Sequence, residues 1–479
     1  MSNRGWWRGG VAVALGAIAV AGCGGGGTKP VAKSALDPAS VVPANSVLYV
    51  SASVRPKGTL QQDLSRVIDQ IGGPNTVAEL NSELGKHASS GFGRRWSQVK
   101  PWLGQRIGAA VIGLPPGQFS EQAVLDYAVL ILPTTDPSAA KTYIASHIKK
   151  SAALIYKIVG NYALIGGPYA VQMAATTAAK VSLADSSAYS SLLTRVGQGA
   201  FATFYDRPYP ILKLETKLFS TEASPPAALA EIKSGLSKIS PNAASLVTLD
   251  VTSNTLRLES TSVGAKAQAG STAISVGHLP AASWLAVALS GGLSSSSTLK
   301  SIESSIGEVS KEEGSALGTK NAGLQFVTND VLPALGPMSL SIAGQTKATV
   351  KVGFALTPGS QSAGDKLLSA VQRMLGKGAA QVKLGHDGNQ LVATYGYKSF
   401  GELLAPQATL SSNPAFRQAL GQLPAGSSAE LFVNFGPIEA LVALDHSSKD
   451  ASAVKVLSHL DYLIAGGHKG SFELVLGVK

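Results

Sequence analysis

The spacing of hydrophobic and polar positions changes along the chain, and each spacing predicts an element. Residues Val47–Val54 alternate in character, which predicts a strand. From Leu60 to Ile71 the apolar residues recur at helical spacing, and Gly72-Gly73-Pro74 ends this predicted helix. The chain therefore begins its folded part with a strand followed by a helix.

The next segment continues as short strands and helices. Residues 107–112 and 126–132 predict two paired strands, and a helix is expected over 136–151. Residues 154–165 predict a hairpin around Gly160-Asn161, followed by a helix to about residue 179. Strands that adjoin through short turns indicate an antiparallel sheet. We therefore expect an α+β fold in which alanine-rich helices pack on a mainly antiparallel sheet.

Segments of the first half recur in the same order in the second half. Their collinear order favours duplication of one unit over chance resemblance between segments rich in alanine and leucine. Each half also closes with a helical stretch and two strands. The matched pairs are 42–50 with 279–287, 101–104 with 333–336, Ala188-Tyr189 with Ala415-Phe416, and strands 246–251 and 255–260 with 462–465 and 471–478.

These patterns divide the chain into five parts, of which two are tandem and duplicated α+β domains. The expected parts are a signal peptide at 1–22, a lipidated N-terminus with a Gly/Ser/Ala/Pro-rich flexible tether at 23–41, a first α+β repeat at 42–264, a linker at 265–277, and a second α+β repeat at 278–479.

The single cysteine lies at position 23, just after the apolar run Val11–Val20. Two arginines precede this run, which has the length of a signal-peptide core and is too short to span a bilayer. Val20-Ala21-Gly22-Cys23 resembles the bacterial lipobox, although valine stands where leucine is commoner. We therefore expect Cys23 to be the lipidated N-terminus. The alternatives are a secretory signal with an accidental cysteine, or an uncleaved anchor helix.

Lipidation at Cys23 would fix the location of the mature protein. One buried chain binds a membrane only marginally at about 0.8 kcal/mol per methylene, whereas two or three chains hold firmly. We expect anchoring to the cell membrane on its extracytoplasmic face, at the cell surface or in the periplasm. With its cysteine consumed, the chain would have no disulfide and no thiol nucleophile.

The chain is basic, with a formal net charge of +11, and its first half holds most of the excess. The densest basic cluster is a candidate contact for anionic lipid or cell-wall polymer. The simpler alternative is a scattered basic surface that aids solubility. No nucleic-acid-binding motif is present, so we expect no nucleic-acid partner. The cluster consists of Arg94, Arg95, Lys100 and Arg106, beside Trp96 and Trp102.

Two segments of the first half resemble the bacterial exported proteins grouped as domain-of-unknown-function family 3352. They are Val42–Val50 and Lys100–Gly104, the second together with the apolar strand that follows it. The resemblance covers the mature chain and rests on structural motifs of moderate specificity. It implies an exported, lipid-anchored protein, and it implies no activity and no site residues.

The sequence lacks the motifs of common catalytic centres. It contains no HExxH, no GxSxG and no Walker lysine, and Gly91-Phe92-Gly93 does not complete a dinucleotide fingerprint. Ser146–Lys149 and Ser297–Lys300 satisfy SxxK, a pattern that arises freely in so serine-rich a chain. His446, His459 and His468 form the densest histidine group, and we expect them to be exposed polar side chains. We therefore expect no enzyme, no metal and no cofactor.

These observations favour a non-enzymatic binding or structural protein of the cell envelope. One alternative is a carrier of an apolar or amphiphilic ligand, because segments rich in Ala, Leu and Val are many and charges are few, at 14% of residues. An envelope hydrolase is a further alternative. The protein partner stays unidentified at this point.

Overall fold

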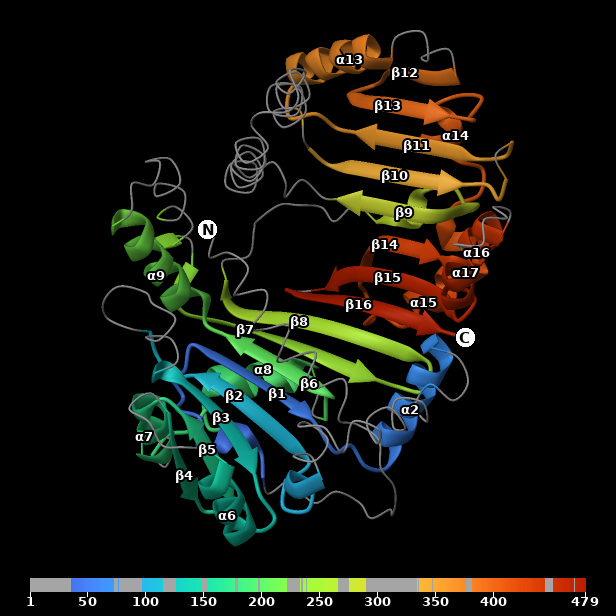
Figure 1. Cartoon of the computed structure of the whole chain (residues 1–479). Helices are drawn as coiled ribbons and strands as arrows, with labels where there is room; N and C mark the ends of the chain where they lie inside the picture. The colour runs from blue at the N-terminus through green and yellow to red at the C-terminus, as the bar shows by residue number, and fades with distance from the viewer. Residues whose placement is uncertain are drawn as a thin grey trace, which may run out of the picture. The chain divides into compact units, whose positions relative to one another are not determined.

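The computed structural model contains two compact units, Met1–Lys266 and Ala267–Lys479 (Figure 1). The division falls inside the segment 265–277 that the sequence assigns to a linker. Each unit is described by itself. The structure describes residues 36–72, 76, 97–114, 126–147, 154–176, 180–196, 199–221, 233, 236–237, 239–265, 275–289, 334, 336–346, 348–375, 381–443, 451–468 and 470–479.

The described part of unit 1 forms an antiparallel sheet in the order β8-β7-β6-β1-β2-β3-β5-β4. The predicted hairpin around Gly160-Asn161 is confirmed as β4 and β5. The strands are β1 (Leu48–Ser53), β2 (Arg106–Val111), β3 (Ala128–Pro133), β4 (Ile155–Val159), β5 (Tyr162–Gly166), β6 (Ala202–Asp206), β7 (Ile239–Val251) and β8 (Thr255–Ala265).

Helices of unit 1 connect these strands. The helix predicted from Leu60 to Ile71 is confirmed as α2, and Gly72 is its last residue. The helices are η1 (Pro38–Val41), α2 (Thr59–Gly72), α6 (Pro137–His147), α7 (Pro168–Thr176), α8 (Ser187–Val196) and α9 (Pro208–Thr221).

The described part of unit 2 forms an antiparallel sheet in the order β16-β15-β14-β9-β10-β11-β13-β12. Taken strand for strand along the chain, this order is the same as in unit 1. The strands are β9 (Ser283–Leu289), β10 (Met338–Ala343), β11 (Lys351–Leu356), β12 (Val382–Asp387), β13 (Gln390–Tyr395), β14 (Ser428–Asn434), β15 (Leu460–His468) and β16 (Ser471–Val478).

Helices of unit 2 follow the strands in a similar sequence. Like α8, which precedes β6, α15 precedes β14, and α16 follows β14 as α9 follows β6. The helices are η3 (Val276–His278), α13 (Gln361–Leu375), α14 (Gly401–Leu404), η8 (Leu410–Ser412), α15 (Pro414–Leu420), α16 (Phe435–Ala443) and α17 (Ala451–Leu457).

The recurring Pro-Ala segment makes the same backbone contacts in both units. In unit 1 the Leu183 N–H donates to the Val42 carbonyl at 2.6 Å, and in unit 2 the Leu410 N–H donates to the Leu279 carbonyl at 2.8 Å. Pro43 and Pro280 each form an isolated antiparallel bridge beside these bonds. The matched sequence segments therefore occupy matched places in the two units.

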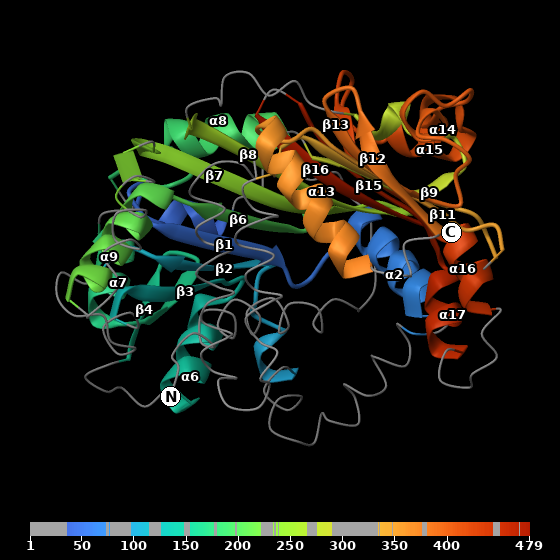
Figure 2. The same ribbon diagram turned by 90° about the horizontal axis from the view of Figure 1, so that it is seen from above.

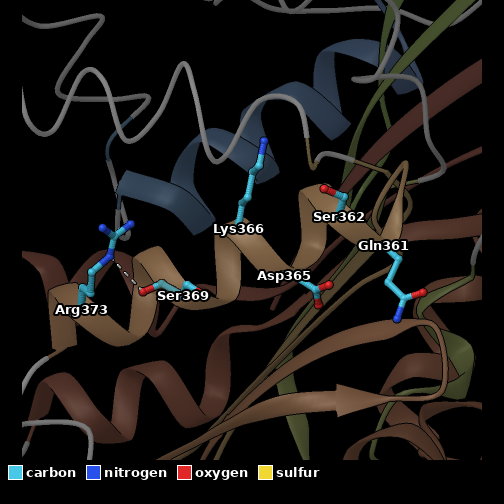
Figure 3. Close-up of a pocket in the computed structure, with 6 residues that line it drawn as sticks. All are labelled: Gln361, Ser362, Asp365, Lys366, Ser369 and Arg373. Atoms are coloured by element: carbon cyan, nitrogen blue, oxygen red, sulfur yellow. Dashed lines mark hydrogen bonds between the residues drawn. The ribbon is translucent and has the colours of Figure 1, made fainter.

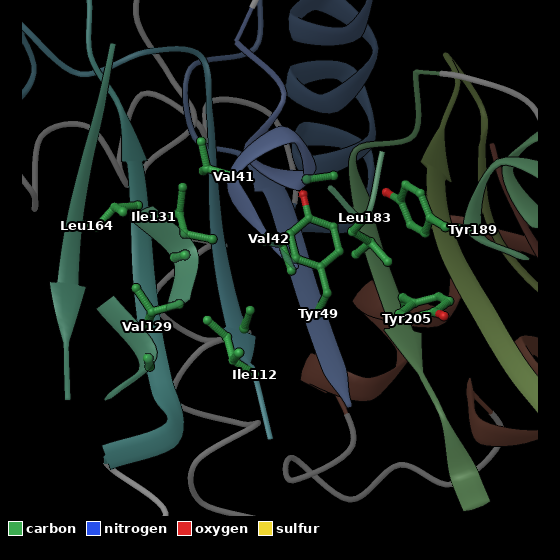
Figure 4. Close-up of a cluster of buried hydrophobic side chains, with 14 of the residues drawn as sticks. Val41, Val42, Tyr49, Ile112, Val129, Ile131, Leu164, Leu183, Tyr189 and Tyr205 are labelled. Atoms are coloured by element: carbon green, nitrogen blue, oxygen red, sulfur yellow. The ribbon is translucent and has the colours of Figure 1, made fainter. Parts of the chain in front are cut away.

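The main core of each unit lies on one face of its sheet, named here the first face. In unit 1, Tyr49 and Tyr205 of the sheet pack with Tyr189 and Leu192 of α8 (Figure 4). In unit 2, Phe432 of β14 packs with helical residues such as Phe416, in a cluster to which α14 also contributes. Helices therefore pack on the sheet as the sequence predicts, and the alanine-rich α7 contributes Ala170 and Ala174 to the core of unit 1.

Both units begin earlier than the sequence predicts. Pro38–Val41, assigned to the flexible tether, forms η1, in which Ala39 is fully buried. The Asp37 carboxylate caps this helix by accepting the Ala39 N–H at 3.0 Å. In the predicted linker, Ser275 caps η3 in the same way. The error arises because small and proline residues near a terminus look like a tether, whereas here an Asp-Pro cap starts a packed turn.

Candidate binding face on the two sheets

The face of each sheet opposite the main core is named here the second face, and it is apolar. In unit 1, one row of paired residues crosses five strands on this face. The row runs through Leu130, Ala109, Val50, Phe204 and Val247. Leu130 is 38% exposed and its neighbours in the row are half-buried. Water therefore reaches apolar side chains along this part of the sheet.

A second row on the same face of unit 1 is also apolar. Ala52 pairs with Ala202, Ala202 with Leu249, and Leu249 with Leu258. Leu258 is 38% exposed. Ala52 and Ala202 themselves are buried, at 0% and 8% exposed, and the next pairs along this face, Leu48 with Asp206 and Asp206 with Ser245, bring in polar side chains. The apolar part of the second face of unit 1 is therefore bordered by polar groups.

Unit 2 has an apolar second face as well. Phe354 pairs with Leu340, and Leu340 with Val287. Val287 pairs in turn with Leu431 on its other side. Beyond it, Leu474 continues the row on β16. An apolar row therefore occurs on the second face of both units, on strands that hold equivalent places in the two strand orders.

The exposed apolar side chains of the strands are confined to the second faces. Among the described strand residues, the four most exposed large apolar side chains all lie on a second face. An exposed apolar surface of this kind marks a binding site more often than a scattered single residue does. These residues are Leu130, Leu258, Leu289 and Phe472, with exposures of 38%, 38%, 36% and 42%.

Helices close the outer part of each second face. In unit 1, α6 packs through Ala140 on Val54 and Leu103, on the side of the sheet opposite α8 (Figure 2). In unit 2, Leu367 of α13 packs on Leu356 and Leu391. The half-exposed central strands are therefore bordered on one side by a helix packed on the same face.

A groove runs along α13 (Figure 3). Its lining is polar and comes from one helix. Asp365 lies 2.9 Å from His386 Nε2, and Arg373 donates to the Ser369 carbonyl at 3.3 Å. These side chains are therefore engaged locally and do not converge on one point. The lining residues are Gln361, Ser362, Asp365, Lys366, Ser369 and Arg373.

Two tyrosine hydroxyls of unit 1 bind Asp37. Tyr49 donates to Asp37 Oδ1 at 3.4 Å, and Tyr162 donates to the Asp37 carbonyl at 3.1 Å. Burial raises the pKa of the Tyr49 hydroxyl well above its usual value, and burial also raises the pKa of Tyr189. These hydroxyls therefore stay protonated at neutral pH and support the core as hydrogen-bonding groups.

Three buried hydroxyl groups of unit 2 lie in a chain of close contacts. Ser283 Oγ lies 2.7 Å from Ser341 Oγ, which lies 3.2 Å from the Tyr397 hydroxyl. Ser283 also donates to the Pro280 carbonyl at 2.7 Å. Lys351 lies over the Tyr397 ring and pairs with Glu402 at 3.4 Å. All three hydroxyl-bearing side chains are buried, so the chain ties strands together beneath the surface.

The predicted basic cluster is described only in part, because Arg94 and Arg95 lie outside the described residues, as does Trp96. The Arg106 guanidinium donates within the protein, to Ser51 Oγ, Thr203 Oγ1 and the Ala200 carbonyl, at 2.6–3.0 Å. Lys100 is half-buried. Arg106 thus binds three oxygens of the sheet and its flanking loop.

Trp102, expected beside the basic cluster at an anionic surface, is buried instead. It is 3% exposed and packs against Tyr143 of α6, with ring centroids 5.8 Å apart. Its nearness to basic residues in the sequence was misleading, because the indole is needed in the contact between α6 and the second face.

The lipobox residues Val20, Ala21, Gly22 and Cys23 lie outside the described residues. So do His446, of the densest histidine group, and Ser297–Lys300. Within the part of the chain that the structure describes, no three His, Cys, Asp or Glu side chains are grouped as metal ligands. No described helix is long and apolar enough to cross a membrane.

Ser146, from the first SxxK pattern, lies near the end of α6. Its hydroxyl lies 2.8 Å from the Tyr143 carbonyl and 2.9 Å from His147 Nδ1. The His147 ring stacks on Tyr143. Ser146 is thus held by its own helix, and Lys149 lies outside the described residues.

Sequence reasoning did not identify the second faces. The signal was present in strands such as β3, whose residues Ala128–Pro133 are apolar at every position. Such a strand is typical of a sheet buried on both faces. Here only one face is covered by the main core, so the apolar residues on the other face are left half-exposed.

Comparison with known proteins adds no relative to this picture. No family model, no curated protein and no solved structure matches the chain.

Proposed function

We propose that the mature protein is a lipid-anchored binding protein of the cell envelope, without catalytic activity, that binds an apolar partner on its second faces. The observation that supports this most directly is the repetition of the apolar second face in both units. Apolar surface that stays exposed to water is costly, because burying it would stabilise the protein or its complex by about 25 cal/mol per Å². Its presence on equivalent strands of both units favours a binding role.

The proposed address rests on the sequence around Cys23. Lipidation there would leave twelve residues between the anchor and Leu36, the first described residue, and a flexible segment of that length reaches on the order of 20 Å. Unit 1 would then stay close to the membrane surface.

We also propose that the two units arose by duplication. The identical strand order and the paired backbone bonds at Leu183 and Leu410 support this origin. A duplicated unit doubles the binding surface of one chain. An envelope hydrolase is the weaker candidate, because Ser146 has no catalytic partner beyond its own helix among the described residues.

Binding of a fluorescent apolar dye, bis-ANS, tests the accessibility of the second faces. The protein is the mature chain with Cys23→Ser, which removes the acylation site. We expect Leu258→Glu combined with Phe472→Glu to reduce dye binding several-fold, because Leu258 lies in the second row of unit 1 and Phe472 lies two residues from Leu474 on the same face of β16. Val181→Glu combined with Val456→Glu is the matched control, because these exposed side chains belong to no strand of either second face.

Equal dye binding by the face variant and the control variant would refute the proposed binding role. The anchor is tested separately by cell fractionation. The native chain should fractionate with membranes, and Cys23→Ser should move it to the soluble fraction. A Cys23→Ser variant that stays in the membrane fraction would refute the lipid anchor.

A further inference from the structure

The described residues of unit 1 expose large apolar side chains in two places. Leu130 and Leu258 lie on the second face. The other three, Leu154, Tyr169 and Val181, are 38%, 45% and 54% exposed and belong to no strand. Single exposed apolar residues are ordinary on a protein surface, whereas a group of them marks an interaction site. Their places relative to the sheet therefore decide whether they form one surface.

All three lie at one end of the sheet, named here the near end, where β1, β3 and β4 begin and β2, β5 and β6 end. Leu154 directly precedes β4. Tyr169 is the second residue of α7, which begins two residues after β5. The Val181 carbonyl accepts the Ala44 N–H at 3.2 Å, shortly before β1. Among the described residues, the opposite end exposes no large apolar side chain.

Tyr169 is suited to the boundary between water and lipid. Its ring packs on Tyr127 with centroids 4.6 Å apart. Both rings lie beside Gly113, where an added Cβ would come within 3.1 Å of Tyr127 and 3.9 Å of Tyr169. Tyrosine is enriched at membrane interfaces, because its ring enters the apolar side and its hydroxyl stays hydrated. The near end therefore combines an interfacial aromatic pair with two exposed aliphatic side chains.

The charged groups of the near end are compatible with lipid headgroups. Lys180 is exposed next to Val181, and a lysine can extend its amino group into water while its methylenes contact apolar surface. The exposed carboxylate of Asp185 accepts the Ser182 hydroxyl at 2.6 Å. Asp206 is half-buried and accepts a bond from a serine of β7. The carboxylates are thus engaged inside the protein, and a lysine stands beside the most exposed apolar side chain.

The path of the chain brings the proposed anchor to this end. The twelve residues between Cys23 and Leu36 span on the order of 20 Å. From Leu36 the chain runs along the loop 181–184 towards the near end. The Ala39 carbonyl accepts the Ala184 N–H at 3.3 Å, and five residues later Ala44 is bonded to the other end of that loop. A bilayer that holds Cys23 is therefore within reach of the near end.

We infer that unit 1 meets the bilayer with its near end, so that Leu154, Tyr169 and Val181 enter the boundary between headgroups and acyl chains. This inference rests on the proposed lipid anchor and identifies the surface that the anchor brings to the membrane. Three side chains bind a membrane weakly by themselves. Because the anchor makes their contact intramolecular, a weak contact suffices to orient the unit.

Fluorescence quenching of the lipidated protein in vesicles tests this contact. Cys23 is the single cysteine and would carry lipid, so Val181→Cys supplies the one free thiol for an NBD fluorophore. The vesicles consist of phosphatidylcholine and phosphatidylglycerol, with a lipid that has a nitroxide quencher near its headgroup. We expect quenching at Val181→Cys to exceed that at Lys57→Cys by about threefold or more, because Lys57 is exposed at the opposite end of unit 1.

A variant of the near end tests which side chains make the contact. With the fluorophore at Leu154→Cys, Tyr169→Asp combined with Val181→Asp should reduce the quenching about twofold or more, because carboxylates oppose entry into the apolar boundary. Lys57→Asp is the matched control and should leave the quenching unchanged. Both near-end side chains are exposed, and circular dichroism checks the fold of the variant. If the double variant does not fold, Val181→Asp alone serves, with a smaller expected reduction.

The outcomes separate this contact from the anchor. Flotation with vesicles, compared between the lipidated chain and Cys23→Ser, reports the anchor alone. A lipidated chain that floats, with equal quenching at Val181→Cys and Lys57→Cys, would refute the near-end contact and leave the anchor in place. A label at Val181→Cys that is unquenched in vesicles but shielded from a water-soluble quencher in cell envelopes would assign the near end to another envelope component. A lipidated chain that does not float would refute the anchor and the contact together.

Discussion

The two units share one strand order and fill their cores with different side chains. Where unit 1 pairs Tyr49 with Tyr205, unit 2 pairs Ala286 with Phe432. The edge-to-face ring contact survives the change. Tyr189 and Tyr205 lie 5.4 Å apart at 86°, and the phenylalanine pair of unit 2, formed by Phe432 with a ring of α15, lies 5.1 Å apart at 89°. The fold therefore depends on the ring contact and not on the tyrosine hydroxyls.

The tyrosine hydroxyls place polar groups inside the core of unit 1. Unit 1 places its tyrosines near Asp37, the cap of η1, whereas unit 2 caps η3 with Ser275 and has no tyrosine at the equivalent sheet positions. Burial is the main cause that raises the pKa of each tyrosine in this cluster. Unit 1 thus has a group of buried tyrosines that should respond to alkaline pH, and in unit 2 burial raises the pKa of Tyr397.

The largest expected effect is the loss of the ring contact of unit 2. Phe416 is 1% exposed, so Phe416→Ala leaves a cavity and should lower the free energy of unfolding by about 3–5 kcal/mol. Denaturant unfolding of the mature chain measures this. Phe416→Leu is the control and should lose clearly less. A loss below about 1 kcal/mol for Phe416→Ala would show that the ring does not support the core.

Alkaline pH should destabilise unit 1 before unit 2. A tyrosine whose folded pKa exceeds its unfolded value of about 10 stabilises the fold fully below pH 10, and this stability is lost as pH rises above 10. Each fully buried tyrosine, as Tyr49 and Tyr189 are, should cost up to about 1.4 kcal/mol per pH unit there.

Hydrogen exchange between pH 9 and pH 11, corrected for the intrinsic rate, measures the local opening of the two units. Protection in β1 and β6 should fall more steeply than protection in β9 and β14. The double variant Tyr49→Phe/Tyr189→Phe is the control and should reduce the difference. Equal slopes in the two units of the parent chain would contradict the role given to the tyrosine cluster.

Removal of one hydroxyl at neutral pH should have a smaller effect. Tyr162 donates to the Asp37 carbonyl at 3.1 Å and lies 2.8 Å from Ser40 Oγ. Tyr162→Phe should cost about 1–1.5 kcal/mol, because Ser40 keeps its own bond to the Asp37 carbonyl. Thermal unfolding checks this value. Tyr127→Phe is the control, because the Tyr127 ring packs against Tyr169 and lies outside the tyrosine cluster around Asp37.

The smallest expected effect is shared equally by the two units. Gly160 and Gly388 occupy the turns of equivalent hairpins with φ values of 53° and 60°, a region that costs a residue with a Cβ about 1 kcal/mol. A Cβ added at either position would meet no atom within 4 Å, so the cost is conformational alone. Gly160→Ala and Gly388→Ala should therefore lower stability by similar amounts. A difference of more than about 1 kcal/mol between the two losses of stability would show that the two hairpins are not equivalent.

Elements with local signals could be predicted from the sequence. The hairpin around Gly160-Asn161 and helix α2 follow from turn residues and from spacing, and both are present. The antiparallel α+β architecture followed from the short connections between strands. The order of strands could not be predicted, because the pairing of β1 with β6 depends on residues that are distant along the chain.

The candidate site could be predicted only as a class of ligand. The abundance of apolar residues indicated an apolar or amphiphilic ligand as one alternative, but no pattern shows which side of a strand a helix will cover. Val129 and Leu130 are adjacent apolar residues of β3, and only Val129 packs in the main core. Trp102 shows the same limit, because its burial under α6 depends on tertiary packing.

Photocrosslinking tests the central claim most directly. A small apolar compound with a photoreactive diazirine is bound to the mature chain with Cys23→Ser and irradiated, and the modified peptides are identified by mass spectrometry. The account predicts modification in the central strands of both units, at second-face residues such as Val50 and Phe204 in unit 1 and Val287 and Leu431 in unit 2. Modification confined to the α13 groove or to first-face residues would contradict it.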